Sequence, residues 1–205
     1  MDWESRYRAG DTPWDLGRPH PELVRRLEVS LIPSGERRAL VPGCGRGHDA
    51  VALANAGWKV IAVDLVASLE ESVSRDLSGL GGEFRSGDVF ALDIEPVDFL
   101  WDHTFFCSLD PLRRVEFGEL AQRVLREGGR LASVVYPLGK VIAEGGPPWG
   151  MTVEQLEDVL RTDFDLVEDD PIFDRGHQSW DERWALFERR EDVDEVTGIG
   201  RHIRS

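Results

Sequence analysis

The chain has 205 residues, 41% of them hydrophobic, which is enough for one α/β domain with its own core and short for two domains. Acidic residues outnumber basic ones by 39 to 24, and the net charge of −15 argues against nucleic acid or an anionic membrane as a partner, because binding phosphates requires clustered Lys and Arg. Two cysteines, Cys44 and Cys107, are too few for a disulfide framework or a CxxC metal site. We expect neither a signal peptide nor a membrane span, and therefore a cytoplasmic protein with no metal site.

The first 36 residues are polar and aromatic, and four prolines interrupt them, which predicts an N-terminal arm with one helix over about 21–30. Trp3, Tyr7 and Trp14 are four and seven residues apart, so they share one stripe if this segment is helical. Aromatic residues at such spacing usually pack into a core. The alternative is a lid whose rings cover an adenine or a sulfonium, because aromatic faces attract cations.

From residue 37 onward, apolar runs alternate with amphipathic segments. Strands are predicted over 37–41, 59–63, 83–86, 97–101, 130–136, 164–168 and 180–188. Helices are predicted between them over 48–56, 66–77, 111–125 and 152–160. This alternation implies an α/β fold with a mostly parallel sheet and an antiparallel pair at the C-terminal edge. We expect a single domain over 1–190 and a loose, charged tail over 191–205.

Glycine and polar residues follow the predicted parallel strands at the point where each strand ends. They are Gly43 to Gly47 after the first strand, Asp64 after the second, Asp88 after the third, Asp102 and His103 after the fourth, and Tyr136 after the fifth. The carboxyl ends of parallel strands meet at one edge of a sheet, where open α/β folds bind their ligands. Glycines let a ligand approach bare backbone, and Asp64 stands where a ribose diol would be bound. The pattern predicts a nucleoside site.

The glycine loop departs from the dinucleotide-binding motif. That motif, G-x-G-x-x-G, requires glycine at position 48, where the chain has His48 followed by Asp49. A carboxylate at the start of the helix disfavours a pyrophosphate, which is held by N–H groups and the helix dipole. A ligand with an ammonium and a sulfonium tolerates this carboxylate. S-adenosylmethionine therefore fits the loop better than NAD.

Several stretches of the sequence together carry a more specific pattern. They are 12–18, 42–49, 87–90, 102–107 and 145–148, with Trp3, Tyr7, Pro111 and Arg114 beside them. These stretches resemble class I S-adenosylmethionine-dependent methyltransferases and, within them, the thiopurine methyltransferase family, especially its halide and thiol methyltransferase branch. The resemblance extends to about residue 189. It implies a Rossmann-like three-layer sandwich, with a seven-stranded, mostly parallel sheet and an antiparallel C-terminal edge strand.

The resemblance also implies a set of cofactor-binding residues. They are Trp3, Tyr7, Trp14, Gly43, Cys44, Gly45, Asp64, Leu65, Asp88, Val89, Asp102 and His103. Trp3 and Trp14 match family tryptophans that close over the cofactor, which favours a lid in the arm, and Tyr7 stands where the branch commonly has a third tryptophan. Asp64 matches the ribose-binding acid, and Asp88 lies in the pair beside the adenine. The implied cofactor is S-adenosylmethionine, with S-adenosylhomocysteine as its product.

The acceptor pocket is implied by the same match. It comprises His103, Phe105, Tyr136, Pro147 and Trp149, with Arg114 as an anion contact or a cofactor-side brace. His103 replaces a tyrosine that is usual in the halide branch. It either helps to deprotonate a thiol, since histidine titrates near neutrality, or is a structural histidine.

We expect methyl transfer by in-line displacement to a small soft nucleophile, such as a thiol, a sulfide or a halide. A soft anion needs no strong base, whereas a neutral hydroxyl would need one. An aromatic thiol or a metalloid oxyanion is the alternative acceptor within the family. An NAD-dependent oxidoreductase and a non-catalytic nucleoside-binding module are the alternatives of other kinds. The expected partner is a small-molecule acceptor, and the expected state is a monomer or a weak homodimer.

Overall fold

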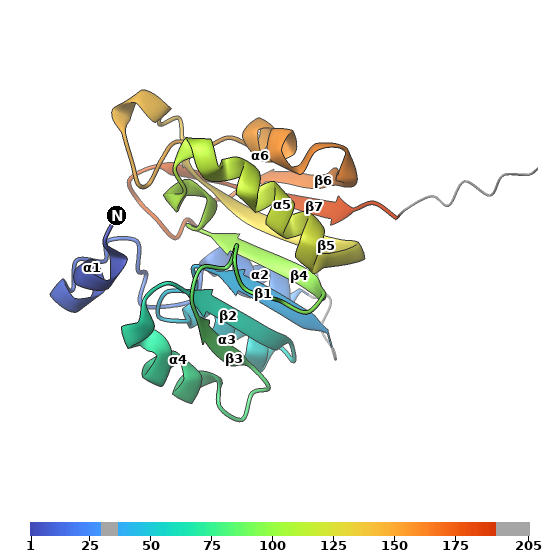
Figure 1. The fold of residues 1–205 in the computed structure, drawn as a ribbon. Coiled ribbons are helices and arrows are strands. Elements are labelled where there is room, and N and C mark those ends of the chain that lie inside the picture. The colour runs from blue at the N-terminus through green and yellow to red at the C-terminus, as the bar shows by residue number, and fades with distance from the viewer. Residues whose placement is uncertain (30–36, 192–205) are drawn as a thin grey trace, which may run out of the picture.

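The computed structural model describes residues 1–29 and 37–191, which form a seven-stranded sheet between helical layers (Figure 1). The strands are β1 (Arg38–Pro42), β2 (Lys59–Asp64), β3 (Glu83–Ser86), β4 (Val97–His103), β5 (Leu125–Leu138), β6 (Phe164–Pro171) and β7 (Asp181–Arg189). Their order is β3-β2-β1-β4-β5-β7-β6, with β1 to β5 parallel and β7 antiparallel to both of its neighbours. The predicted α/β class, with a reversed strand at the C-terminal edge pair, is confirmed.

Helices cover both faces of the sheet. They are α1 (Trp3–Ala9), α2 (Pro21–Glu28), α3 (His48–Asn55), α4 (Glu70–Leu77), α5 (Arg114–Val124) and α6 (Val153–Leu160). Short 3-10 turns lie at 67–69, 106–108, 111–113, 142–144 and 161–163. In Figure 1, α5 and α6 lie on one face and α2 and α3 on the other, whereas α1 stands out from the body beside the carboxyl ends of the strands.

The central strands are apolar along nearly their whole length because both of their faces are covered. Leu40 of β1 lies in register with Ile61 of β2 and Leu100 of β4, and all three side chains are buried. Trp58, just before β2, packs against Phe99 with 5.4 Å between ring centroids. This packed centre fixes where β1, β2 and β4 end, and therefore where the residues that follow them meet.

Gly128 and Gly129 lie between the predicted helix over 111–125 and the predicted strand over 130–136, but they do not form a loop there. The helix ends at Val124 and β5 begins directly at Leu125, before the predicted start at 130. Val97 pairs with Leu125 whereas Phe99 pairs with Arg130, so the intervening residues form an irregularity within the strand. Glycines inside strands often mark such irregularities, because the backbone there leaves the regular pleat.

Two predictions reach beyond the described residues. The helix predicted over 21–30 ends at Glu28, and residue 30 lies outside the described ranges. The predicted loose tail lies outside them as well, apart from residue 191. In the described ranges, no helix is both long enough and apolar enough to cross a bilayer.

Candidate functional site

The glycine loop after β1 is fixed by the carboxylate that ends β2. Gly45 donates its backbone N–H to Asp64 Oδ2 over 2.8 Å, and Val66 donates its N–H to Asp64 Oδ1 over 3.0 Å. Gly43 has a φ of 58°, and a Cβ there would lie 2.6 Å from Phe105 Cδ2. Only glycine fits this approach without displacing the ring. Each oxygen of Asp64 keeps a lone pair for a further donor.

A cavity of about 810 Å³ opens at the carboxyl ends of the strands. Among its lining residues are the predicted Trp3, Tyr7, Trp14, Gly43, Asp64, Leu65, Asp88, Val89, Phe105, Tyr136, Pro147 and Trp149. Most of the residues predicted for the cofactor and the acceptor are therefore brought together around one space. Burial raises the pKa of Asp64 and of Tyr136, and among the described residues no histidine lines this cavity.

The aromatic residues of the N-terminal arm form one side of this cavity. Trp14 packs edge-on against Trp3 and Tyr7, at centroid distances of 5.3 and 5.8 Å, and its indole N–H donates to Tyr7 Oη over 3.1 Å. The pKa of Tyr7 is raised to about 12, chiefly by burial. No residue of α1 is fully buried, and Trp3 and Tyr7 pack against the edge of the protein core while they also line the cavity.

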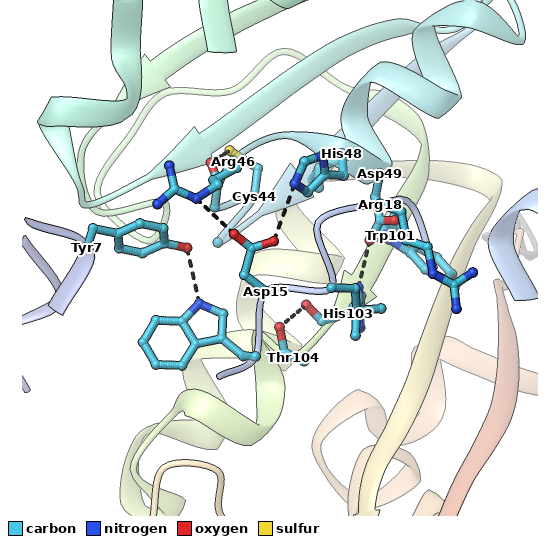
Figure 2. Close-up of a pocket in the computed structure, with 15 residues that line it drawn as sticks. Tyr7, Asp15, Arg18, Cys44, Arg46, His48, Asp49, Trp101, His103 and Thr104 are labelled. Carbon is cyan, nitrogen blue, oxygen red and sulfur yellow. Dashed lines mark hydrogen bonds and ion pairs between the residues drawn. The ribbon is translucent and has the colours of Figure 1, made fainter. Parts of the chain in front are cut away.

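The arm is attached to the glycine loop by Asp15. Its carboxylate lies 2.8 Å from Arg46 Nε and 3.3 Å from His48 Nε2, and Figure 2 shows it between these two side chains. Tyr7 also reaches the loop, because a Cβ on Gly45 would lie 2.6 Å from the Tyr7 hydroxyl. The arm therefore closes over the loop through an ion pair and an aromatic ring.

Asp49 is not among the described residues that line the large cavity; it lines a second, smaller cavity beside Trp101 and His103 (Figure 2). It accepts the backbone N–H of His20 over 2.7 Å, the indole N–H of Trp101 over 2.9 Å and His103 Nδ1 over 2.7 Å. That this carboxylate disfavours a pyrophosphate at the loop stays a prediction. Helix α3 turns the side chain toward β4 and the arm, where three donors fix it in a polar cluster.

The same cluster contains a run of histidines. His103 Nε2 lies 3.1 Å from His177 Nε2, and His20 Nε2 lies 3.1 Å from Glu182 Oε2. Glu22 donates its backbone N–H to His20 Nδ1, so the proton of His20 is on Nε2 and its ring is neutral. No group of three or more His, Cys, Asp or Glu side chains in the described residues is arranged to hold a metal ion.

The pKa of His103 is set by opposing effects. Burial lowers it, but the charge of Asp49, the hydrogen bond to Asp49 and the charges of Glu182 and Asp102 together raise it above its ordinary value. Burial opposes ionisation of Asp49, yet the charge of His103 and its hydrogen bonds bring the pKa of Asp49 down to about 2. Burial and the neighbouring His103 lower the pKa of His177 to about 4. Because the Asp49 carboxylate can only accept, His103 donates to it from Nδ1.

The prediction of His103 as a base for the acceptor is not supported by this geometry. Both ring nitrogens are occupied, and the side chain does not line the large cavity. The structural alternative fits, because the ring joins the end of β4 to α3 and to the connection between β6 and β7. A strand-end position alone does not reveal which way the side chain turns.

Asp102 and Arg114 also lie outside the large cavity, contrary to their predicted contacts. Asp102 is 1% exposed; it accepts the Phe106 backbone N–H over 2.9 Å and the Ser133 hydroxyl over 2.6 Å. Arg114 is buried and donates to the carbonyl of Gly150 over 3.0 Å. Asp102 shapes the turn after β4. Arg114 holds the loop over 145–150, called the acceptor loop below, through the carbonyl of Gly150.

The remaining two predicted residues, Cys44 and Gly45, belong to the glycine loop itself. They line the smaller cavity of about 50 Å³, which shares Tyr7, Trp14, Gly43 and Thr104 with the large cavity. Burial raises the pKa of the Cys44 thiol well above its usual range, so the sulfur is an unreactive, packed group.

Thr104, Lys140 and Trp180 are among the cavity residues that were not predicted. Thr104 follows β4 with a φ of 63°, which is rare for a β-branched residue and costs backbone strain. Lys140 donates from Nζ to the carbonyl of Pro148 over 2.6 Å. Trp180 reaches the cavity from the connection between β6 and β7. Thr104 belongs to the specific 102–107 stretch and could have been singled out there, whereas no local pattern marks the other two.

Comparisons with known proteins agree with this geometry. The family model for thiopurine S-methyltransferase matches residues 1–197. A probable thiol methyltransferase 2 of Arabidopsis thaliana is 36% identical over 163 residues, which cover 77% of this chain and 70% of that protein. A thiopurine S-methyltransferase of Pseudomonas aeruginosa is 28% identical over 222 residues, covering 91% of this chain and 97% of the relative.

A solved structure shares the fold. The 1,6-didemethyltoxoflavin-N1-methyltransferase of Burkholderia thailandensis, with bound 1,6-didemethyltoxoflavin and S-adenosylhomocysteine, has a TM-score of 0.71 to this chain at 22% identity. The match covers 93% of this chain and 86% of that one. At this level of identity the likeness extends to the arrangement of helices and strands.

Proposed function

Since the chain belongs to the thiopurine S-methyltransferase family, we propose that it transfers a methyl group from S-adenosylmethionine to a small soft anion, namely a thiolate, hydrosulfide or halide. The observation that carries this proposal is the single large cavity in which Gly43 and Asp64 meet Phe105, Tyr136 and Trp149. Its described lining contains no histidine that could act as a base. A soft anion needs none, because it already carries the attacking electron pair.

The residues around the cavity suit the proposed cofactor. Asp64 keeps one lone pair on each oxygen, which matches the two hydroxyls of a ribose. Gly43 offers bare backbone beside it, and Asp88 and Val89 follow β3 where an adenine would lie. Trp14 lines the cavity with the Arg6 guanidinium 4.4 Å from its ring centroid, a cation–aromatic contact of the kind that a sulfonium would also make.

Bound S-adenosylmethionine would supply a methyl group on a positively charged sulfur. The chain excludes water and aligns the acceptor, which is where most of the acceleration of an in-line displacement originates. The aromatic side chains of Phe105 and Trp149 form an apolar wall, and the hydroxyl of Tyr136 can donate to an anion. Burial raises the pKa of Tyr136, so this hydroxyl keeps its proton.

Cys107 lines the cavity without competing as an acceptor. Its thiol donates to the carbonyl of Thr104 over 3.4 Å, and its side chain is buried. Burial raises its pKa far above the usual range of a thiol. The sulfur is therefore protonated and weakly nucleophilic. This arrangement keeps the methyl group for an external acceptor.

We further propose that the N-terminal arm, residues 1–36, acts as a lid over the cofactor. We also propose that the protein works in the cytoplasm as a monomer or weak homodimer, with one domain over 1–190. The ion pair between Asp15 and Arg46 supports the lid, because it joins the arm to the glycine loop. Two observations support a small-molecule acceptor: the acceptor side of the cavity is largely aromatic, and the net charge of −15 disfavours nucleic acid.

The test is incubation with methyl-labelled S-adenosylmethionine and a panel of acceptors: hydrosulfide, small thiols, iodide and an aromatic thiol, with volatile products trapped. We expect labelled product from the small anions. Preference for the aromatic thiol would favour the alternative acceptor class within the family over a small anion. Parallel titrations with S-adenosylhomocysteine and NADH separate the enzyme classes, and binding of NADH alone would overturn the proposal. Cofactor binding without product from any acceptor would favour a non-catalytic module.

A further inference from the structure

Among the described residues, three basic side chains line the large cavity, and two of them lie in ion pairs. Arg6 lies 2.9 Å from Asp11, and Arg113 lies 2.6 Å from Glu116. Lys140 is the third, and within the described ranges it forms no ion pair with a carboxylate. It is one of only two lysines among the 24 basic residues of the chain. An uncompensated cation on a cavity wall attracts an anion.

Lys140 is held in place from several directions. Its ammonium donates to the Pro148 carbonyl over 2.6 Å, which leaves two N–H donors. The chain folds back closely here, because a Cβ on Gly150 would lie 1.8 Å from the Lys140 carbonyl oxygen. Trp149 donates its backbone N–H to the Cys107 carbonyl over 2.7 Å and so ties the same loop to the turn after β4. The ammonium is therefore fixed beside the acceptor loop.

Arg114 has a different place in the same region. The family match implied an anion contact or a brace for Arg114. Its guanidinium is buried, stacks 4.7 Å from the Phe106 ring centroid and donates to Gln155 and to the Gly150 carbonyl. It supports the loop that carries Pro148, and it leaves the cavity wall to Lys140. The two cations thus divide the tasks of bracing the loop and facing the acceptor.

We propose that Lys140 binds the acceptor anion and selects anionic over neutral acceptors, an inference that rests on the proposed methyl transfer. A thiol acceptor would bind as its thiolate, with its proton left in solvent, and a halide would bind as it is. The methylated product is neutral in either case. Lys140 therefore holds the acceptor and has no charge interaction with the product, which favours product release.

The first test compares Lys140→Gln, Lys140→Arg and wild type, with Lys59→Gln as a control for loss of charge at an exposed site. Glutamine keeps a donor for the Pro148 carbonyl but removes the charge, and arginine keeps both. We expect the KM for iodide to rise about tenfold in Lys140→Gln, because a close charge pair is lost. Lys140→Arg and Lys59→Gln should stay near wild type, and affinity for S-adenosylhomocysteine should be unchanged in all. An unchanged KM in Lys140→Gln would reduce Lys140 to a structural role and overturn the inference.

The second test does not depend on turnover. The complex with S-adenosylhomocysteine is treated with an amine-acetylating reagent in sodium iodide or in sodium chloride of equal ionic strength, and labelling of Lys140 and Lys59 is measured by mass spectrometry. We expect iodide to slow labelling of Lys140 only. Protection without turnover would leave the anion site standing and overturn the proposed function. Turnover without protection of Lys140, together with an unchanged KM in Lys140→Gln, would support the proposed methyl transfer and overturn the anion site at Lys140.

Discussion

At the scale of single residues, Asp64 serves both the loop and the ligand site. It accepts backbone N–H groups from Gly45 and Val66 and faces the large cavity. Replacing Asp64 with Ala should weaken S-adenosylhomocysteine binding about 10- to 100-fold, because hydrogen bonds to a charged group are lost. Asp88→Ala is the comparison: the Asp88 carboxylate is half-exposed, so its loss should weaken S-adenosylhomocysteine binding only a few-fold. Calorimetric titration measures both, and equal losses would contradict the special place of Asp64.

Asp49 is a residue whose role is structural. It accepts three donors in a buried cluster, and an asparagine has one carbonyl oxygen and must turn an NH₂ group toward one of them. Asp49→Asn should lower the free energy of unfolding by about 1–3 kcal/mol, as expected when a buried donor loses its acceptor. Urea unfolding tests this, with the exposed Asp76→Asn as control. A loss of stability in the control as large as in Asp49→Asn would refute the assignment.

At the scale of elements, the histidine cluster joins the arm, α3, β4 and β7. The pKa of His177 is lowered to about 4, so between pH 6.5 and 4 the unfolded chain binds more protons than the folded chain, and this contribution to stability is lost as pH falls through that window. His177→Gln should therefore reduce the difference in unfolding free energy between pH 7 and pH 5. Urea unfolding at the two pH values measures it, and a difference equal to that of wild type would show that His177 does not titrate in this way.

The raised pKa of His103 acts in the opposite direction. Its contribution is complete below the pKa of the unfolded chain and is lost as pH rises through the folded value. The contribution of His177 is complete above the pKa of an unfolded-chain histidine, about 6.5, and the contribution of His103 is complete below it. The two histidines together should therefore stabilise the fold most near that pH.

The N-terminal arm is the second element with a distinct role. If Trp14 stabilises a sulfonium, Trp14→Ala should weaken binding of S-adenosylmethionine about three- to fivefold more than binding of uncharged S-adenosylhomocysteine. Trp14→Phe should keep the charge preference, because it keeps an aromatic face, although it loses the N–H that reaches Tyr7. The ratio of the two dissociation constants is the measurement. Equal weakening for both ligands in Trp14→Ala would leave the ring a packing role only.

The glycine loop, the central strands and the reversed C-terminal pair could be predicted because their signals are local. An apolar run buried on both faces reads as a parallel strand, and a loop with positive φ angles requires glycine. The start of β5 could not be predicted, since pairing with β4 carries the strand through a glycine pair that resembles a loop. Tertiary pairing outweighed the local turn signal there.

At the scale of the whole molecule, the family resemblance was confirmed and the sheet order brought most of the predicted site residues to one cavity. The predicted residues that do not line this cavity differ in the direction of their side chains. Asp102 and His103 end β4 as predicted, but they turn into buried clusters whose partners come from distant parts of the chain, such as Ser133 and His177. No spacing within the sequence records such partners.

The central claim is that one cavity holds the methyl donor and a soft anion together. The most direct measurement is a single turnover in which enzyme in excess over S-adenosylmethionine is mixed with iodide, and S-adenosylhomocysteine and iodomethane are quantified. We expect the two products in equal amounts, at a rate that rises with iodide concentration and then saturates. S-adenosylhomocysteine formed without iodomethane, or no reaction with iodide, hydrosulfide or a thiol despite bound cofactor, would contradict the claim.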